Sequence, residues 1–163
     1  MDISVYKLDD ETIKQYYMDS INSDSRSLTF TLNPKMYSAD ILTQYRKAIH
    51  EIKSSKIFYY KQKGVETIHP DFEEMLIIPE LTDKLNIHFH GYIKCNPDKY
   101  QYFYNEFRKF TYNNEVIGRQ MMFKNIDNLT EALKGYPFKD IKEMLKFPDS
   151  RKMYIYKFSK KNL

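Results

Sequence analysis

The sequence predicts an α+β domain in which helices pack on one antiparallel sheet. Segments with strand periodicity and segments with helical periodicity follow each other in the order αβα, three strands, α, β, α. The strands cluster instead of alternating strictly with helices, which favours antiparallel pairing. A length of 163 residues suits one domain that buries its own core. We expect a single domain over residues 1–163, with residues 1–25 as a peripheral N-terminal segment.

The elements are assigned from apolar spacing and from turn-forming residues. Expected helices, with apolar residues three or four positions apart, cover 10–18, 41–52, 98–110 and 127–147. Expected strands, with alternating or β-prone composition, cover 27–33, 56–62, 73–80, 85–94, 115–126 and 150–163. Ser38 is placed to cap the second helix. We expect the strands at 56–62 and 73–80 to pair with each other as a hairpin or ribbon.

Composition limits the classes of function. The single cysteine, Cys95, cannot pair within the chain, which favours a reducing, intracellular compartment. No apolar run approaches the roughly 20 residues of a membrane span. A net charge of +4 suits a polyanionic partner, and fifteen tyrosines and eleven phenylalanines can stack unpaired bases beside lysines. AT-rich coding explains the same aromatic excess without any binding role.

The stretch Leu85–Lys94, "LNIHFHGYIK", predicts half of a metal site. Strand residues two apart point to the same face, with Cα atoms about 6.6 Å apart, so His88 and His90 can reach one ion. Gly91 is expected to leave open space beside them. The pair also fits two half-buried histidines that are hydrogen-bonded to their neighbours, so a third ligand must decide between these interpretations.

Glu80 is the expected third ligand. It ends the preceding strand, eight residues before His88, and a return of that length brings its carboxylate beside the imidazoles. Glu73 and Glu74 lie at the far end of the same strand, which rises about 3.3 Å per residue, and Asp83 is the fallback ligand. Two imidazoles and one carboxylate with open positions suit Mn²⁺ or Mg²⁺ in contact with substrate oxygen, whereas a structural zinc site takes a fourth protein ligand.

Three motifs, taken together, resemble those of the HUH endonucleases, and in particular the rolling-circle replication initiators (Rep proteins) of circular single-stranded DNA viruses and related plasmids. "FTLN" at 30–33 resembles the first motif, "HFHG" at 88–91 the second and "YPFKD" at 136–140 the third, whose pattern is Y-x-x-K. All three occur in the family order and span most of the chain. The combination is therefore more specific than any single motif.

The Y-x-x-K pattern occurs at Tyr60, Tyr136 and Tyr154, and position decides among them. The family places its tyrosine on a helix that follows the strand after the histidine motif, which selects Tyr136 together with Lys139. Tyr154 stays a rival nucleophile, because Pro137 directly after Tyr136 is awkward inside a helix.

The resemblance implies a ferredoxin-like or RRM-like fold with a central antiparallel sheet of about five strands and flanking helices. It also implies a metal-dependent endonuclease that nicks single-stranded origin DNA and can rejoin strands. In that reading His88, His90 and Glu80 hold Mn²⁺ or Mg²⁺. Tyr136 attacks phosphorus and forms a 5′-phosphotyrosine bond, and Lys139, one helical turn further on, steadies phosphate charge or favours tyrosinate.

The implied partner is single-stranded DNA at a replication origin, with a stem-loop. Thr29, Thr31 and Asn33 around the first motif are candidate DNA contacts, although an ordinary core strand explains this motif equally well. Many family members continue into a helicase domain, but this chain has no G-x-x-x-x-G-K-[ST] loop, so we expect an isolated nuclease domain or a short Rep that works with a helicase. The implied location is the host nucleus for a eukaryotic virus and the cytoplasm for a bacterial plasmid or phage.

Two other functions fit parts of the pattern. A single-tyrosine transposase of the insertion-sequence type shares the histidine pair, but its tyrosine helix usually lacks Y-x-x-K and it has no FTLN-like strand. A non-catalytic module that binds single-stranded nucleic acid would stack bases on an aromatic sheet. Such a binder would bind DNA equally well in the presence of a chelator and would never become covalently attached to it.

Overall fold

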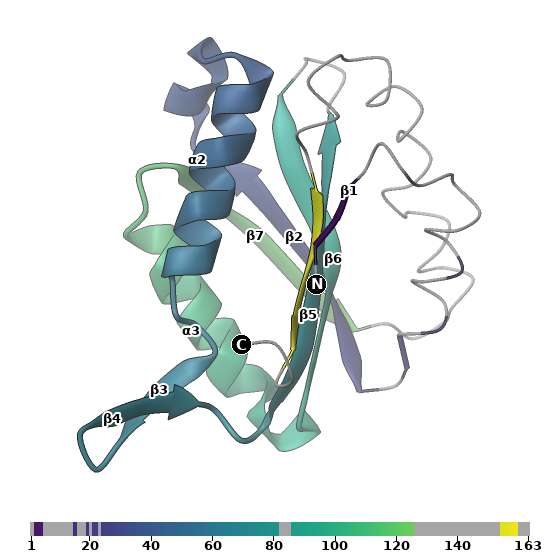
Figure 1. Cartoon of the computed structure of the whole chain (residues 1–163), viewed down its shortest axis with the longest axis vertical. Helices are drawn as coiled ribbons and strands as arrows, with labels where there is room; N and C mark the ends of the chain where they lie inside the picture. The colour runs from purple at the N-terminus through teal and green to yellow at the C-terminus, as the bar shows by residue number, and fades with distance from the viewer. Residues whose placement is uncertain are drawn as a thin grey trace.

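The computed structural model describes residues 2–4, 15, 19, 21–22, 24–81, 86–125 and 154–159, and the fold is given for these residues. They form a six-stranded antiparallel sheet, two α-helices on one of its faces and a separate two-stranded hairpin (Figure 1). Five strands of the sheet have six to ten residues, and the sixth, at one edge, has three. The expected α+β class with a central sheet of about five strands is confirmed.

Most elements lie close to their predicted positions. The strands are β1 (Asp2–Ser4), β2 (Ser25–Leu32), β3 (Tyr59–Gln62), β4 (Val65–Ile68), β5 (Phe72–Leu81), β6 (Ile87–Cys95), β7 (Ile117–Asn125) and β8 (Tyr154–Ser159). The helices are α2 (Ile41–Ser54), α3 (Tyr100–Tyr112) and the short 3₁₀ helices η2 (Pro34–Ser38) and η3 (Pro97–Lys99). The helix predicted over 127–147 and most of the one predicted over 10–18 lie outside the described residues.

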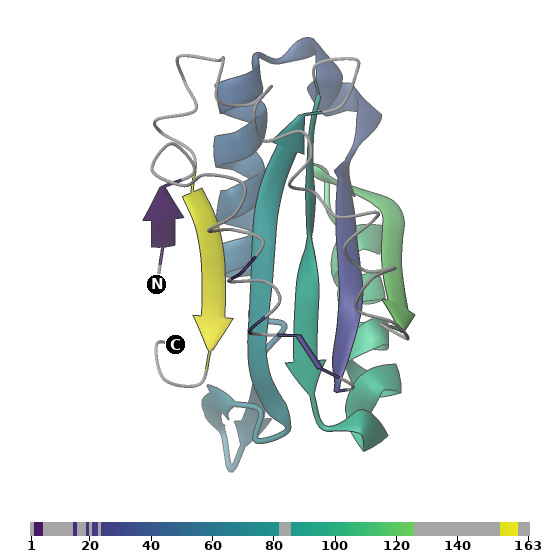
Figure 2. The same cartoon turned by 90° about the vertical axis from the view of Figure 1, so that its right-hand side faces the viewer.

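The inner strands have the split βαβ topology of ferredoxin-like domains. The strand order across the sheet is β1-β8-β5-β6-β2-β7, and Figure 2 shows these strands side by side. Along the chain β2, α2, β5, β6, α3 and β7 follow each other, so β6 lies between the two strands that α2 connects. Neither α2 nor α3 has the length and apolar character of a membrane span, and the same holds for the rest of the described chain.

The face covered by the helices carries a large part of the core. The ring centroid of Phe30 in β2 lies 5.5 Å from that of Phe107 in α3, and Phe89 in β6 lies 6.4 Å from Tyr45 in α2. The residues predicted to alternate inward along β2 are all buried: Leu28, Phe30 and Leu32. Cys95, at the end of β6, is also buried, and this burial raises the pKa of its thiol to about 12, so the thiol stays protonated.

The predicted helix cap at Ser38 is wrong. Ser38 ends η2, and the N-cap of α2 is Asp40, whose carboxylate accepts hydrogen bonds from the backbone nitrogen of Thr43 at 2.9 Å and from its Oγ1 at 2.7 Å. These bonds lower the pKa of the Asp40 carboxyl. Serine and aspartate are both good N-cap residues. Ser38 still belongs to the 3₁₀ helix that starts at Pro34, so α2 begins after Asp40, the later of the two.

The predicted pairing of 56–62 with 73–80 is also wrong. β3 pairs with β4 through a two-residue turn at Lys63 and Gly64, whose φ angles are 51° and 77°, as a type I′ hairpin requires. β5 instead lies between β6 and β8 in the central sheet. Its nearly continuous burial fits an inner strand, whereas β3 is half-exposed.

The open space predicted beside Gly91 is filled. A Cβ atom at this position would overlap the backbone carbonyl oxygen of Leu76 in β5. Gly91 therefore permits a close approach of β5 and β6 next to His90.

We expect Gly91→Ala to destabilise the protein by about 1–3 kcal/mol, because the added methyl group must push β5 and β6 apart. Gly64→Asn is the matched control: a Cβ there meets nothing within 4 Å, and asparagine tolerates a positive φ. Urea unfolding followed by circular dichroism measures both variants. A Gly91→Ala variant as stable as the wild type would contradict the close approach.

Candidate metal centre

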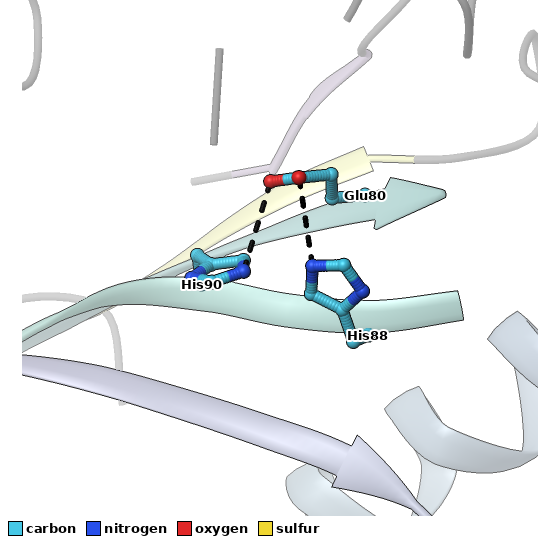
Figure 3. A group of neighbouring side chains, drawn as sticks. All are labelled: Glu80, His88 and His90. Atoms are coloured by element: carbon cyan, nitrogen blue, oxygen red, sulfur yellow. Dashed lines mark ion pairs between the residues drawn. The ribbon is translucent and has the colours of Figure 1, made fainter. Parts of the chain in front are cut away.

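Adjacent strands β5 and β6 bring three possible metal ligands together. Glu80 of β5 is the register partner of His88 of β6, and His90 lies opposite Ile78, two residues further along the pair. Because strand side chains alternate, all three residues share the sheet face opposite to the helices. Figure 3 shows the Glu80 carboxylate pointing toward both imidazoles. The predicted return of the chain after Glu80 therefore places this residue as expected.

The candidate ligand atoms lie close to the spacing that the shell of one ion requires. Glu80 Oε1 lies 3.5 Å from His88 Nε2, and Glu80 Oε2 lies 3.8 Å from His90 Nε2. One ligand atom from each of the three residues lies within 4.8 Å of the others. Atoms that bind the same ion at about 2.1 Å are about 3–3.5 Å apart in octahedral or tetrahedral geometry, so small side-chain rotations complete the shell. The group can hold a metal ion.

Burial gives this group a reason to bind a cation. The side chain of Glu80 is only 8% exposed, compared with 16% for His88 and 26% for His90. A buried carboxylate without a compensating charge carries a desolvation penalty of several kcal/mol. Both distances from the carboxylate to the imidazoles exceed ordinary hydrogen-bond lengths. A divalent cation between the three side chains would offset the charge of the carboxylate directly, and the donor set fits such an ion.

Contacts from α2 and β2 support the strand that carries the histidines. Buried Gln44 of α2 accepts a hydrogen bond from the backbone nitrogen of Ile87 at 3.0 Å and donates one to the carbonyl oxygen of Ala39 at 2.9 Å. From the other side, Thr29 Oγ1 lies 3.3 Å from His90 Nδ1. Sequence reasoning missed Gln44, although a polar residue beside the apolar stripe of a helix is a signal that points to such a contact.

Glu74 does not belong to this group of side chains. It lies at the other end of β5, where its Oε1 accepts a hydrogen bond from the Tyr92 hydroxyl at 2.8 Å. The ammonium groups of Lys157 and Lys94 lie 3.3 Å and 3.8 Å from its carboxylate oxygens. Two cations therefore compensate Glu74, whereas Glu80 faces imidazoles. The fallback ligand Asp83 lies outside the described residues.

The candidate nucleophile is not placed by the structure. Tyr136 and Lys139 lie outside the described residues. Tyr60 belongs to β3 of the separate hairpin, where its hydroxyl donates a hydrogen bond within the same strand. Tyr154 begins β8, which is a strand, so the one-turn spacing of a helix does not apply to Tyr154 and Lys157.

The candidate DNA contacts around the first motif all have contacts within the domain. Thr29 lies beside His90, and the Thr31 hydroxyl lies close to Gly118 of β7. The Asn33 side chain caps η2, because its Oδ1 accepts a hydrogen bond from a backbone nitrogen of that helix at 3.2 Å. A role of these residues in DNA binding stays a prediction.

Comparisons of the chain with models of protein families, with curated proteins and with solved structures gave no match. The resemblance to HUH endonucleases therefore rests on the three motifs alone. The geometry of Glu80, His88 and His90 carries the functional argument.

We expect Glu80→Gln to weaken Mn²⁺ binding at least about 100-fold, because it removes both the charge and a ligand oxygen. Isothermal titration of the metal-free protein with MnCl₂ measures the affinity. For the wild type, free Mn²⁺ at 100 times its dissociation constant should raise the free energy of unfolding by about 2.7 kcal/mol.

Glu74→Gln is the matched control for this experiment, because Glu74 lies on the same strand and the same sheet face. This variant should lose stability through its ion pairs with Lys94 and Lys157 but keep the wild-type affinity for Mn²⁺. Unaltered Mn²⁺ binding by Glu80→Gln, or equal losses in both variants, would show that Glu80 is not a ligand.

Proposed function

We propose that the protein is a replication-initiator endonuclease that nicks single-stranded origin DNA and stays joined to its 5′ end through a tyrosine. The observation that carries the proposal is the group of Glu80, His88 and His90 on adjacent strands of a ferredoxin-like sheet. The FTLN-like motif precedes these residues in the sequence and the Y-x-x-K motif follows them. Three convergent metal ligands favour phosphoryl transfer over simple binding, because a sheet that only stacks bases needs no ion.

Mn²⁺ or Mg²⁺ is the ion that we propose for the centre. His88 and His90 would supply neutral nitrogens and Glu80 a carboxylate oxygen, which leaves open positions for phosphate oxygens and water. When bound, such an ion polarises the scissile phosphate and offsets its developing negative charge. The half-buried position of the ligands supports this role, since charges interact more strongly where water is partly excluded.

Tyr136 is the proposed nucleophile. Its phenolic oxygen forms a bond to phosphorus while the bond between phosphorus and the 3′ oxygen breaks. The phenol proton is released, and the 3′ oxygen takes up a proton to leave as a hydroxyl group. Lys139 is proposed to stabilise charge on the phosphate or on the tyrosinate. Attack by a 3′-hydroxyl on the phosphotyrosine reverses the step and rejoins strands without a nucleotide triphosphate.

We expect a denaturation-resistant protein–DNA adduct when the protein is mixed with Mn²⁺ and a library of fluorescent single-stranded oligonucleotides with a randomised central segment. The adduct should be visible on a denaturing gel, and EDTA should prevent it, because cleavage needs the ion. Sequencing the captured DNA gives the preferred site. A stem-loop that carries this site, used as the substrate, should also yield the adduct.

Variants identify the nucleophile in the same assay. Tyr136→Phe should abolish the adduct and keep DNA binding, whereas Tyr154→Phe is the matched control and should cleave like the wild type. Mass spectrometry of the trapped adduct names the modified peptide directly. DNA binding that is equal with and without EDTA and never becomes covalent would instead identify a non-catalytic binding module. Loss of the adduct in Tyr154→Phe alone would reject Tyr136.

A further inference from the structure

We propose that Thr29 is a positioning residue for His90: its hydroxyl oxygen accepts a hydrogen bond from the Nδ1–H group and so leaves the Nε2 lone pair directed at the ion. Thr29 and His90 are register partners on β2 and β6, and Thr29 Oγ1 lies 3.3 Å from His90 Nδ1. The inference rests on the metal centre and does not depend on the DNA chemistry. It gives Thr29 a role that acts through His90, in place of the direct DNA contact expected from the first motif.

Metal binding through Nε2 of His90 would require the ring proton to lie on Nδ1. A neutral imidazole has one N–H group, and the nitrogen that binds a metal must present its lone pair. Nε2 lies 3.8 Å from Glu80 Oε2, which is too far for a hydrogen bond, whereas Nδ1 lies within hydrogen-bonding range of the Thr29 hydroxyl. The Thr29 hydroxyl is thus placed to accept a hydrogen bond from Nδ1–H. The tautomer with the proton on Nδ1 is the form that a metal at Nε2 requires, and ligand histidines donate their second ring N–H to a neighbouring group.

The surroundings of Thr29 hold its hydroxyl in place. β2 is paired on both sides, with β6 and β7, and the adjacent Phe30 is fully buried against α3. The β-branched side chain of threonine also has few rotamers. His90 is the more exposed of the two histidines, at 26% against 16% for His88, so its ring has more freedom to lose when it is held. A ring ordered before the ion arrives lowers the free-energy cost of assembling the site.

Titration of the metal-free full chain with Mn²⁺, followed by electron paramagnetic resonance of the free ion, tests this role. Thr29→Val keeps the shape and the strand propensity but removes the acceptor, and we expect about 10- to 100-fold weaker binding. Thr29→Ser restores the hydroxyl and should bind nearly as well as the wild type. Ser27→Ala is the matched control, because it removes a hydroxyl from the same strand face opposite Tyr92 and should leave the affinity unchanged.

Nitrogen-15 NMR of the imidazoles in the metal-free protein reports which ring nitrogen carries the proton. A purely structural role of Thr29 would leave this signal unchanged. In the wild type the proton of His90 should reside on Nδ1, and Thr29→Val should shift it toward Nε2 without changing His88. A wild-type His90 with its proton on Nε2, or a Thr29→Val variant with wild-type Mn²⁺ affinity, would overturn the inference alone. A wild-type protein that binds no Mn²⁺ would overturn the metal centre, and with it both this inference and the proposed function.

Discussion

The register of β5 against β6 is the constraint on which the candidate metal centre depends. Glu80 faces His88 only in this pairing, and a slip by one residue would carry the carboxylate to the helix-covered face and leave the histidines without an acid. The core fixes this register, because Phe89 must pack against α2 while Gly91 lets the backbone of Leu76 approach closely. The packing that forms the core therefore also assembles the ligands on the other face.

Glu74, which is half-buried, and Glu80, which is buried, show how partner chemistry separates a structural ion pair from a candidate metal site. Both lie on the same face of the same strand, and both need compensation for a carboxylate held largely away from water. Glu74 is compensated by Lys94 and Lys157, which would repel a metal ion. Glu80 has two imidazoles beside it, whose lone pairs attract an ion. The strand thus carries one carboxylate that stabilises the sheet and one whose charge suits a cation.

Local patterns predict the ligand set but not the long-range pairings. His88 and His90 share a face because strand side chains alternate. Glu80 precedes His88 by only eight residues, so the antiparallel pairing of two neighbouring strands brings its carboxylate beside the histidines. The strands that flank β5 could not be predicted in this way. One of them is β8, which is more than 70 residues away in the sequence, and the continuous burial of β5 depends on it. The contact of Thr29 with His90 is equally non-local, because only the register of β2 against β6 creates it. The filled space beside Gly91 follows from the same pairing of distant strands.

The side chains of β8 alternate between the two faces of the sheet. In β8, Lys157 is paired with Leu76 and reaches Glu74, so position 157 belongs to the face of the metal centre. By alternation, Tyr156 belongs to the helix-covered face, where its hydroxyl lies 3.3 Å from that of Tyr45. Tyr60 belongs to the separate hairpin and not to the sheet that carries the candidate metal centre. The proposal of Tyr136 over Tyr154 therefore rests on the order of the motifs in the sequence.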